Sequence, residues 1–300
     1  MSKATPTRQQ RARERIAAQQ AAERRAETRR RLFITGGSVL AVIVIVVAFV
    51  LVKSAGGGSS PTPTAGGPTG TPLPASVIRD ITSVPASTAA TVGKGTTIPR
   101  AVVPLSGTPL TSGGKPEVLY VGAEYCPFCA AERWAMAVAL SRFGTFSGLH
   151  GIHSSSTDVY PNTPTLTFYK STYTSKYLTF TPVETTTMNS APLQKATAAQ
   201  QALLKKYDAP PYVPSQAKGA IPFIDFGNKF MISGASYNPQ VLQGKTWSEV
   251  ASSLSDPSSP ISQGAVGAAN LITAALCKLT GNQPASACTP AVLKLEAQLR

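Results

Sequence analysis

The 300-residue sequence predicts an α/β domain built on a sheet that helices cover on both faces. Residues 117–123 form an apolar run without period-2 alternation, which is typical of a strand buried on both faces. Residues 130–143 predict a helix with apolar side chains on two sides, so it should lie between the sheet and another layer. Residues 220–232 predict two strands joined by a turn at Gly227-Asn228. One transmembrane helix is expected before this domain, and extra strands and a helical C-terminal extension within it.

Residues 32–52 predict the transmembrane helix, because this run of 21 residues contains no charged side chain. At about 1.5 Å per residue, a helix of this length crosses the roughly 30 Å hydrocarbon core of a bilayer. A cleaved signal peptide is the alternative interpretation. Its apolar core is usually only about 7 to 15 residues long, and here Lys53 follows the run directly. The sequence therefore favours a membrane anchor.

The basic residues before this helix predict its orientation. Residues 1–31 contain ten Lys and Arg against three Glu, which is half of the net charge of +14. Because positive charge stays on the cytoplasmic side, we expect a cytoplasmic basic tail and an extracytoplasmic C-terminal part of a single-pass cell-membrane protein. The tail has almost no apolar face, which favours a solvated segment touching anionic lipid head groups over a specific RNA or protein contact. The rest of the chain is only mildly basic, so no nucleic-acid partner is expected.

Residues 53–74 are rich in Gly, Pro, Ser and Thr and predict a flexible linker with a reach of about 25 Å. The composition changes at Ala75, where apolar residues begin to recur at helical spacing. We therefore predict that the folded domain spans residues 75–300. Further strands are expected around residues 101–105, 149–154, 165–169 and 177–182. Further helices are expected at residues 75–84, 193–207, 239–250, 263–279 and 290–299.

The candidate site is the pair Cys126 and Cys129, which stands between the predicted strand 117–123 and the helix 130–143. A thiol at a helix N-terminus has its thiolate stabilised by the helix dipole and by unpaired backbone N–H groups. Cys129, one turn later, can then resolve a mixed disulfide. This pattern favours a redox pair over a purely structural disulfide or a metal site.

A zinc site would need four ligands, and the spacing of the remaining candidates, His150, His153 and the distant cysteines, does not favour a closed site. We therefore predict no metal. The two histidines are expected to be plain surface or loop residues. Glu124, beside the Cys pair, is expected to be a solvated residue at the end of the strand.

Cys277 and Cys288 are predicted to form a structural disulfide around a short loop. No strand-to-helix junction activates either thiol, and such a bond is stable in an extracytoplasmic compartment.

The strand leading into Cys-Pro-Phe-Cys at a helix start, and the later Ile-Pro that opens a hairpin, resemble the thioredoxin superfamily. The resemblance implies a three-layer sandwich, Cys126 as the exposed nucleophile and Cys129 as the buried resolving thiol. It also implies a cis-proline at Pro222. The residues expected to bind substrate are Tyr125, Pro127, Phe128, Ile221 and Pro222. With its anchor, its Ser/Thr-rich middle and its C-terminal Cys pair, the chain also resembles an uncharacterised family of membrane-anchored, thioredoxin-like proteins, DUF929.

These observations together predict a membrane-tethered extracytoplasmic thiol-disulfide oxidoreductase. Its partners would be the thiols and disulfides of secreted or membrane proteins, an unidentified redox partner that recycles the Cys pair, and the bilayer around residues 32–52. No cofactor is expected. The same residues serve an oxidase, an isomerase or a reductase, because direction depends on the reduction potential relative to the partner. Two alternatives stay open: a non-catalytic thioredoxin-like binding module with a static disulfide, and a copper metallochaperone.

Overall fold

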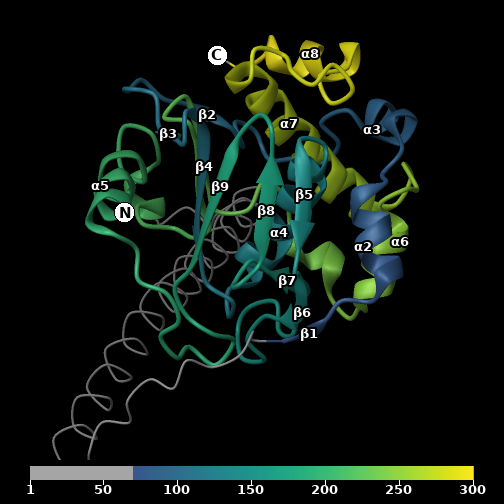
Figure 1. Cartoon of the computed structure of the whole chain (residues 1–300). Helices are drawn as coiled ribbons and strands as arrows, with labels where there is room; N and C mark the ends of the chain where they lie inside the picture. Colours follow the sequence, from purple (N-terminus) through teal and green to yellow (C-terminus); the bar gives the residue numbers. More distant parts are fainter. Residues whose placement is uncertain (1–69, 300) are drawn as a thin grey trace, which may run out of the picture. The chain divides into compact units, whose positions relative to one another are not determined.

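The computed structural model describes residues 70–299 (Figure 1). The predicted basic tail 1–31, the predicted membrane helix 32–52 and most of the linker 53–74 lie outside the described residues. Within residues 70–299, every helix is too short or too polar to cross a membrane.

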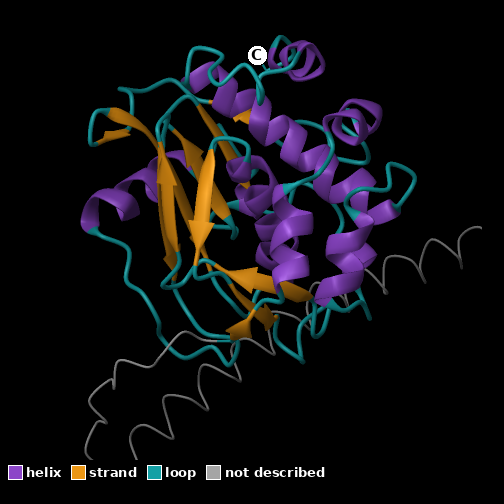
Figure 2. Cartoon of the chain, turned by 45° about the vertical axis from the view of Figure 1, so that its right-hand side comes forward, coloured by secondary structure: helices purple, strands orange, loops and turns teal. Residues whose placement is uncertain are grey.

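The main sheet is mixed, and β4 lies at its centre (Figures 1 and 2). Strand β9 pairs with β4 in parallel, and β10 pairs with the opposite edge of β4 in antiparallel register. The hairpin β10-β11 turns at Gly227-Asn228 as predicted, and both turn residues have positive φ. The strands are β2 (Val103–Pro104), β3 (Thr111–Ser112), β4 (Lys115–Gly122), β9 (Thr179–Glu184), β10 (Phe223–Phe226) and β11 (Phe230–Ser233).

Two smaller sheets flank the main one. Strands β1 (Thr71–Pro72), β6 (His150–His153) and β7 (Pro164–Thr167) form one of them, and β5 (Gly144–Ser147) and β8 (Thr172–Ser175) form the other. The sequence predicts β6 and β7 correctly. It misses β5 and β8 because both are short strands that alternate half-buried with exposed residues and carry many Ser and Thr.

Seven α-helices are described between residues 70 and 299, and most of them fall where the sequence predicts helices. The predicted helix 193–207 is too long, because Thr197 caps its true start with a side-chain acceptor for the Gln200 N–H. The predicted helix 239–250 is wrong as one element: a 3-10 turn ends at Leu242, and Gly244 has a φ of 68°. The helices are α2 (Ala75–Thr82), α3 (Ala86–Val92), α4 (Pro127–Ser141), α5 (Ala198–Tyr207), α6 (Trp247–Ser253), α7 (Gly267–Leu279) and α8 (Pro290–Glu296).

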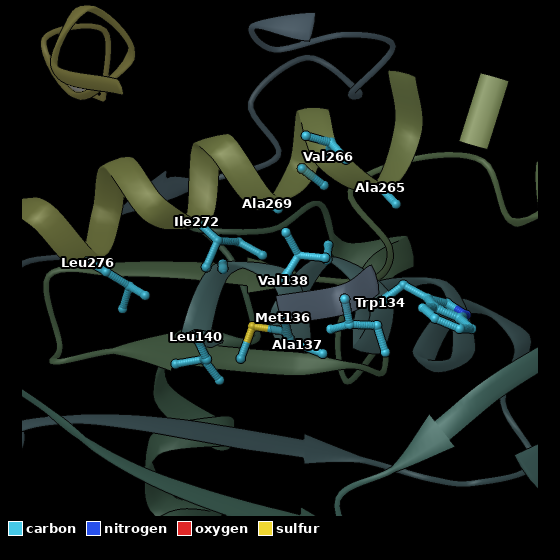
Figure 3. Close-up of a cluster of buried hydrophobic side chains, with 14 of the residues drawn as sticks. Trp134, Met136, Ala137, Val138, Leu140, Ala265, Val266, Ala269, Ile272 and Leu276 are labelled. Atoms are coloured by element: carbon cyan, nitrogen blue, oxygen red, sulfur yellow. The ribbon is translucent and has the colours of Figure 1, made fainter. Parts of the chain in front are cut away.

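The described domain has helices on both faces of the main sheet. On one face, α4 and α7 pack in the larger hydrophobic core, which includes Val118 and Ile224 of the sheet. On the other face, a smaller core joins Leu119 and Phe223 to Tyr207 of α5. Every residue of α4 from Cys129 to Leu140 is buried. Figure 3 shows why: Val138 and its neighbours on α4 face an apolar row on α7 and on the π-helical turn Ser262–Val266 that leads into it. The row comprises Ala265, Val266, Ala269, Ile272 and Leu276.

Cys277 and Cys288 are joined by the disulfide that the sequence predicts, with an S–S distance of 2.04 Å. The bond links the last turn of α7 to the segment that precedes α8. It lies in the large hydrophobic core, because both cysteines are buried there.

Candidate functional site

The Cys pair lies at the junction between β4 and α4. Cys126 is the N-cap residue of α4, and its sulfur accepts a hydrogen bond from the backbone N–H of Cys129 at 3.3 Å. Pro127 occupies the first helical position, where its missing N–H costs nothing. Both cysteines are free thiols, and both are buried. Cys126 is 5% exposed, so it is not the exposed thiol that the resemblance implies, because Tyr125 and Ile221 pack around it. The helix start therefore aims its unpaired N–H groups at the Cys126 sulfur, as the sequence predicts.

The segment before β10 lies against this pair. The Cys126 thiol donates to the carbonyl oxygen of Ile221 at 3.7 Å, and the Ile221–Pro222 bond is cis. Tyr125 and Ile221 pack around the two cysteines and are partly buried. The structure thus brings together segments that are 95 residues apart in the sequence.

The predicted substrate-binding residues differ in accessibility. Pro127 and Pro222 are buried, while Tyr125 and Ile221 are half-buried. Phe128 is 39% exposed. Only part of the predicted set is thus available to a partner surface.

The two thiols differ strongly in environment. Hydrogen bonds from the Cys129 thiol and backbone N–H, and the nearby Arg133 charge, lower the pKa of Cys126. Burial raises the pKa of Cys129 well above its usual value, and the neighbouring Cys126 raises it further. Cys126 is therefore the thiol that ionises first, and Cys129 stays protonated beside it.

A fully buried ion pair lies beneath the cysteines. Arg133, one helical turn after Cys129, donates from Nε and Nη2 to the two carboxylate oxygens of Glu184, each at 2.8 Å. Its Nη2 also donates to the carbonyl oxygen of Ala123 at 2.7 Å. No pattern in the sequence predicts a role for Arg133 or Glu184. The sequence feature that points to Arg133 is the pair Glu132-Arg133, two charged residues inside an otherwise apolar helix.

Glu124 corrects the prediction that it is solvated. It is fully buried, and its carboxylate accepts a hydrogen bond from the Thr167 hydroxyl at 2.7 Å. The position of Glu124 at the end of a strand predicts exposure, but Thr167 of β7 covers that end of β4. No local pattern in the sequence predicts this contact.

The residues of this site lie within a region that matches a known protein family. A family model described as "Domain of unknown function (DUF929)" matches residues 101–278, which is more than half of the chain. The chain belongs to the DUF929 family. The matched region of this DUF929 protein includes the Cys pair, Arg133, Glu184 and Pro222, and it ends just after Cys277. Comparison with curated proteins finds no match, and comparison with solved structures finds none.

An open hollow of about 410 Å³ in the DUF929 protein lies near the Cys pair. Its position follows from two backbone hydrogen bonds, from Ser155 N–H to the Tyr125 carbonyl and from Glu124 N–H to the Thr186 carbonyl, at 2.8 and 2.9 Å. Its lining is mostly uncharged and polar, and comprises His153, Ser154, Ser155, Ser156, Thr157, Asn162, Met188, Asn189 and Ser190.

An apolar ridge accompanies this hollow. The Phe128 ring contacts the Tyr160 ring edge-to-face, with the centroids 5.9 Å apart. Val159, next in the same loop, is 63% exposed. Both loop residues belong to segments that the sequence predicts only as loop.

The histidines of the DUF929 protein lie on β6. The His153 ring contacts the Trp247 ring in a tilted arrangement, with the centroids 4.8 Å apart, and burial lowers the pKa of His153. His150 Nδ1 lies 2.9 Å from the Gly148 carbonyl oxygen. Cys277 and Cys288 are bonded to each other, and residues 70–299 hold no group of three or more His, Cys, Asp or Glu with metal-site geometry.

Proposed function

We propose that this DUF929 protein is a membrane-anchored, extracytoplasmic thiol-disulfide oxidoreductase of thioredoxin-like fold. The observation that carries the proposal is the asymmetry of the Cys pair: Cys126 caps α4 and has a lowered pKa, while Cys129, inside the first turn and fully buried, has a raised one. A nucleophile must be a thiolate near neutral pH, and a resolving thiol must not compete with it.

The strand arrangement supports the thioredoxin-like part of the proposal. Strand β4, helix α4 and the parallel strand β9 form one half, and the antiparallel hairpin β10-β11 forms the other. Pro222 directly precedes β10 and lies beside Cys126 through Ile221. This is the relation between the Cys pair and a cis-proline that the resemblance implies.

In the proposed reaction, the Cys126 thiolate attacks one sulfur of a substrate disulfide. The substrate S–S bond breaks, a mixed disulfide forms, and the other substrate sulfur leaves as a thiolate. Cys129 then loses its proton and attacks Cys126 Sγ, which forms the Cys126–Cys129 bond and releases the second substrate thiol. The substrate gains two electrons and two protons in this direction, and every step is reversible. No cofactor takes part.

The surface around Cys126 suits a polypeptide substrate. Tyr125, Phe128 and Ile221 offer the accessible contacts, and Pro127 and Pro222 shape the groove from below. We propose that partners are secreted or membrane proteins with thiols or disulfides, and that residues 32–52 hold the domain at the outer side of the membrane. A separate redox partner recycles the pair.

A trapping experiment tests the proposal. The Cys129→Ser variant of the full chain, in detergent micelles, should accumulate a mixed disulfide between Cys126 and a scrambled model protein. The Cys126→Ser variant should accumulate none, and the wild-type chain should turn the substrate over. Absence of both turnover and trapping would contradict the proposal and favour the binding module. Stoichiometric binding of Cu(I) that needs both cysteines, without turnover, would favour the metallochaperone.

A further inference from the structure

Two buried hydrogen-bond donors beside the Cys pair have no partner among the described residues. They are Nη1 of Arg133 and the hydroxyl of Tyr120, and both side chains are 0% exposed. Leaving a buried donor unsatisfied costs about 1–3 kcal/mol, and more when the group is charged. Such a group in a native fold requires an explanation, and a role in redox chemistry is one of the known ones.

The contacts of Arg133 hold the guanidinium in place but do not use Nη1. Nε and Nη2 bind Glu184 of β9, and Nη2 also binds Ala123 at the end of β4. The guanidinium carbon lies 5.9 Å from the centre of the Tyr120 ring. Contacts from β9 and from β4 with its end thus fix the guanidinium one turn below Cys129, and Nη1 is left without a partner among the described residues.

Negative charge arises at Cys129 when the disulfide form of the pair reacts. A substrate thiolate that bonds to Cys126 Sγ breaks the Cys126–Cys129 bond, and the electron pair of that bond leaves on Cys129 Sγ. Cys129 is 0% exposed, so water does not solvate this charge. Burial raises the pKa of Cys129, and the Arg133 charge opposes that rise. Donors that are already in place stabilise developing charge in a dry site without reorganisation.

We propose that Arg133 and Tyr120 are positioning residues that stabilise the buried Cys129 leaving group, and that they make the Cys pair an oxidant of substrate dithiols. The inference rests on the proposed oxidoreductase function and assigns it a direction. The same Arg133 charge lowers the pKa of Cys126, which is the thiolate of the reduced pair. Stabilising this thiolate stabilises the reduced form, and that raises the reduction potential of the pair.

When the pair oxidises a substrate dithiol, the first substrate thiolate forms the mixed disulfide with Cys126, and Cys129 takes up a proton. The second substrate thiolate attacks the substrate sulfur of that mixed disulfide, forms the substrate disulfide and releases Cys126 as a thiolate. The substrate dithiol loses two electrons and two protons. A partner protein that carries a disulfide must then reoxidise the pair.

The charged groups around the pair allow a test with opposite signs. The Arg133 charge acts to lower the pKa of both thiols and so favours a thiolate, and the buried Tyr120 hydroxyl is a donor that would act in the same direction. Glu184 partly neutralises Arg133, and Glu124 places a second carboxyl near the pair. A nearby carboxylate disfavours a thiolate. Removing the Arg133 charge and removing the Glu184 charge must therefore move the potential in opposite directions. A purely structural role would move both variants the same way.

The experiment equilibrates the full chain in detergent micelles with reduced and oxidised glutathione. The Arg133→Met variant should shift the equilibrium about tenfold toward the disulfide, which is about 30 mV lower in potential for a two-electron couple. The Glu184→Gln variant should shift it about as far toward the dithiol. Tyr120→Phe should shift it in the same direction as Arg133→Met by about threefold, because it removes one neutral donor and almost no volume.

Two further variants keep the test decisive. The double variant Arg133→Met/Glu184→Gln leaves no unpaired buried charge, so it should fold and stay within about twofold of the wild-type equilibrium. Glu132→Gln removes the adjacent buried charge on the same helix, which faces Ser236, and should leave the glutathione equilibrium unchanged. Shifts of the same sign in both single variants, or a Tyr120→Phe equilibrium identical to wild type, would overturn the inference. A wild-type chain that does not exchange with glutathione would overturn the proposed function instead.

Discussion

Helices α4 and α7 are both largely buried and pack against each other (Figure 3). Both have cysteines near one end, but the ends are opposite. Cys126 caps the N-terminus of α4, whereas Cys277 lies in the last turn of α7 and is bonded to Cys288. The N-terminal end of a helix stabilises a thiolate and the C-terminal end disfavours one. The helix end therefore stabilises a cysteine thiolate at α4, whereas at α7 it does not, and the cysteine there forms a disulfide.

The two helices also differ in what they bury. Helix α4 buries the charged residues Glu132 and Arg133, while the buried polar residues of α7 are the neutral Asn270 and Thr273. Asn270 donates to two carbonyl oxygens near α3, and Thr273 donates to its own helix. Both also accept from Nη1 of Arg142, so their hydrogen bonds tie α7 to neighbouring segments. Burying a charge is costly unless it is paired, and such residues concentrate at functional sites. This difference supports the proposal that α4 carries the redox chemistry, whereas α7 contributes to the stability of the core.

Removing the α4 side of the shared core should have the largest effect. Trp134 is fully buried, and its indole N–H donates to the Pro164 carbonyl at 2.9 Å. We expect Trp134→Ala to lower the free energy of unfolding by about 4 kcal/mol, because it leaves a cavity and an unpaired carbonyl. Urea unfolding measures this. Trp247→Ala, at a half-buried Trp with a similar hydrogen bond, should cost clearly less; equal costs would argue against the central position of α4.

Removing each Cys pair should separate stability from chemistry. The Cys277→Ser/Cys288→Ser variant opens a loop of 11 residues of sequence separation and should lower the free energy of unfolding by about 3 kcal/mol. Its thiol exchange at low temperature should match that of the wild type. The Cys126→Ser/Cys129→Ser variant should lose exchange and keep most of its stability. A loss of thiol exchange in the Cys277→Ser/Cys288→Ser variant, or a large loss of stability in the Cys126→Ser/Cys129→Ser variant, would contradict the difference between the two helices.

The buried charge of Glu132 should make the stability of α4 depend on pH. Burial raises the Glu132 pKa to about 7, although Ser236 donates to both of its carboxylate oxygens. Because the unfolded chain loses this proton near its ordinary pKa of about 4.5 and the folded chain only near 7, stability falls as pH rises through that window. From pH 5 to 7 the loss amounts to about 2 kcal/mol.

Glu132→Gln isolates this effect, since an amide keeps the shape and can still accept from Ser236. The variant should lose the 2 kcal/mol pH dependence between pH 5 and 7 and be the more stable protein at pH 7. Parallel stability profiles for wild type and Glu132→Gln would contradict the role of the buried carboxyl.

The sequence predicts the centre of the fold because the information there is local. The apolar run of β4, the Cys pair, the helix after it and the Gly227-Asn228 hairpin each fit within a few residues. The short elements α3, β5 and β8 are missed because their patterns are weak and tertiary packing decides them. Glu124 is missed because its cover comes from Thr167, 43 residues away.

The site residues also fall into two groups: those that a local pattern predicts and those that only the fold brings together. The positions of Cys126 and Cys129 follow from the helix start, and Pro222 follows from the resemblance. The pairing of Arg133 with Glu184 joins residues 51 apart, and no spacing rule connects them. What the sequence does contain is the anomaly of two charges in an apolar helix. Two buried charges in an otherwise apolar helix break the expected pattern, and such breaks are expected at functional or strained sites; here they fall on the helix of the proposed site.

The smallest expected effect concerns partner recognition at the exposed end of α4. Phe128 is 39% exposed and contacts the Tyr160 ring, so part of its surface is free for a polypeptide. We expect Phe128→Ala to slow exchange with a protein substrate about fivefold, because it removes about 1 kcal/mol of apolar contact in the complex. Exchange with a small aromatic disulfide should stay unchanged, since Cys126 keeps its cap and its thiolate. Val159→Ala, farther along the same ridge, should have a smaller effect in the same direction. Equal slowing of both substrates would mean that Phe128 acts on the thiol itself, and the exposed end of α4 would then belong to its chemistry and not to recognition.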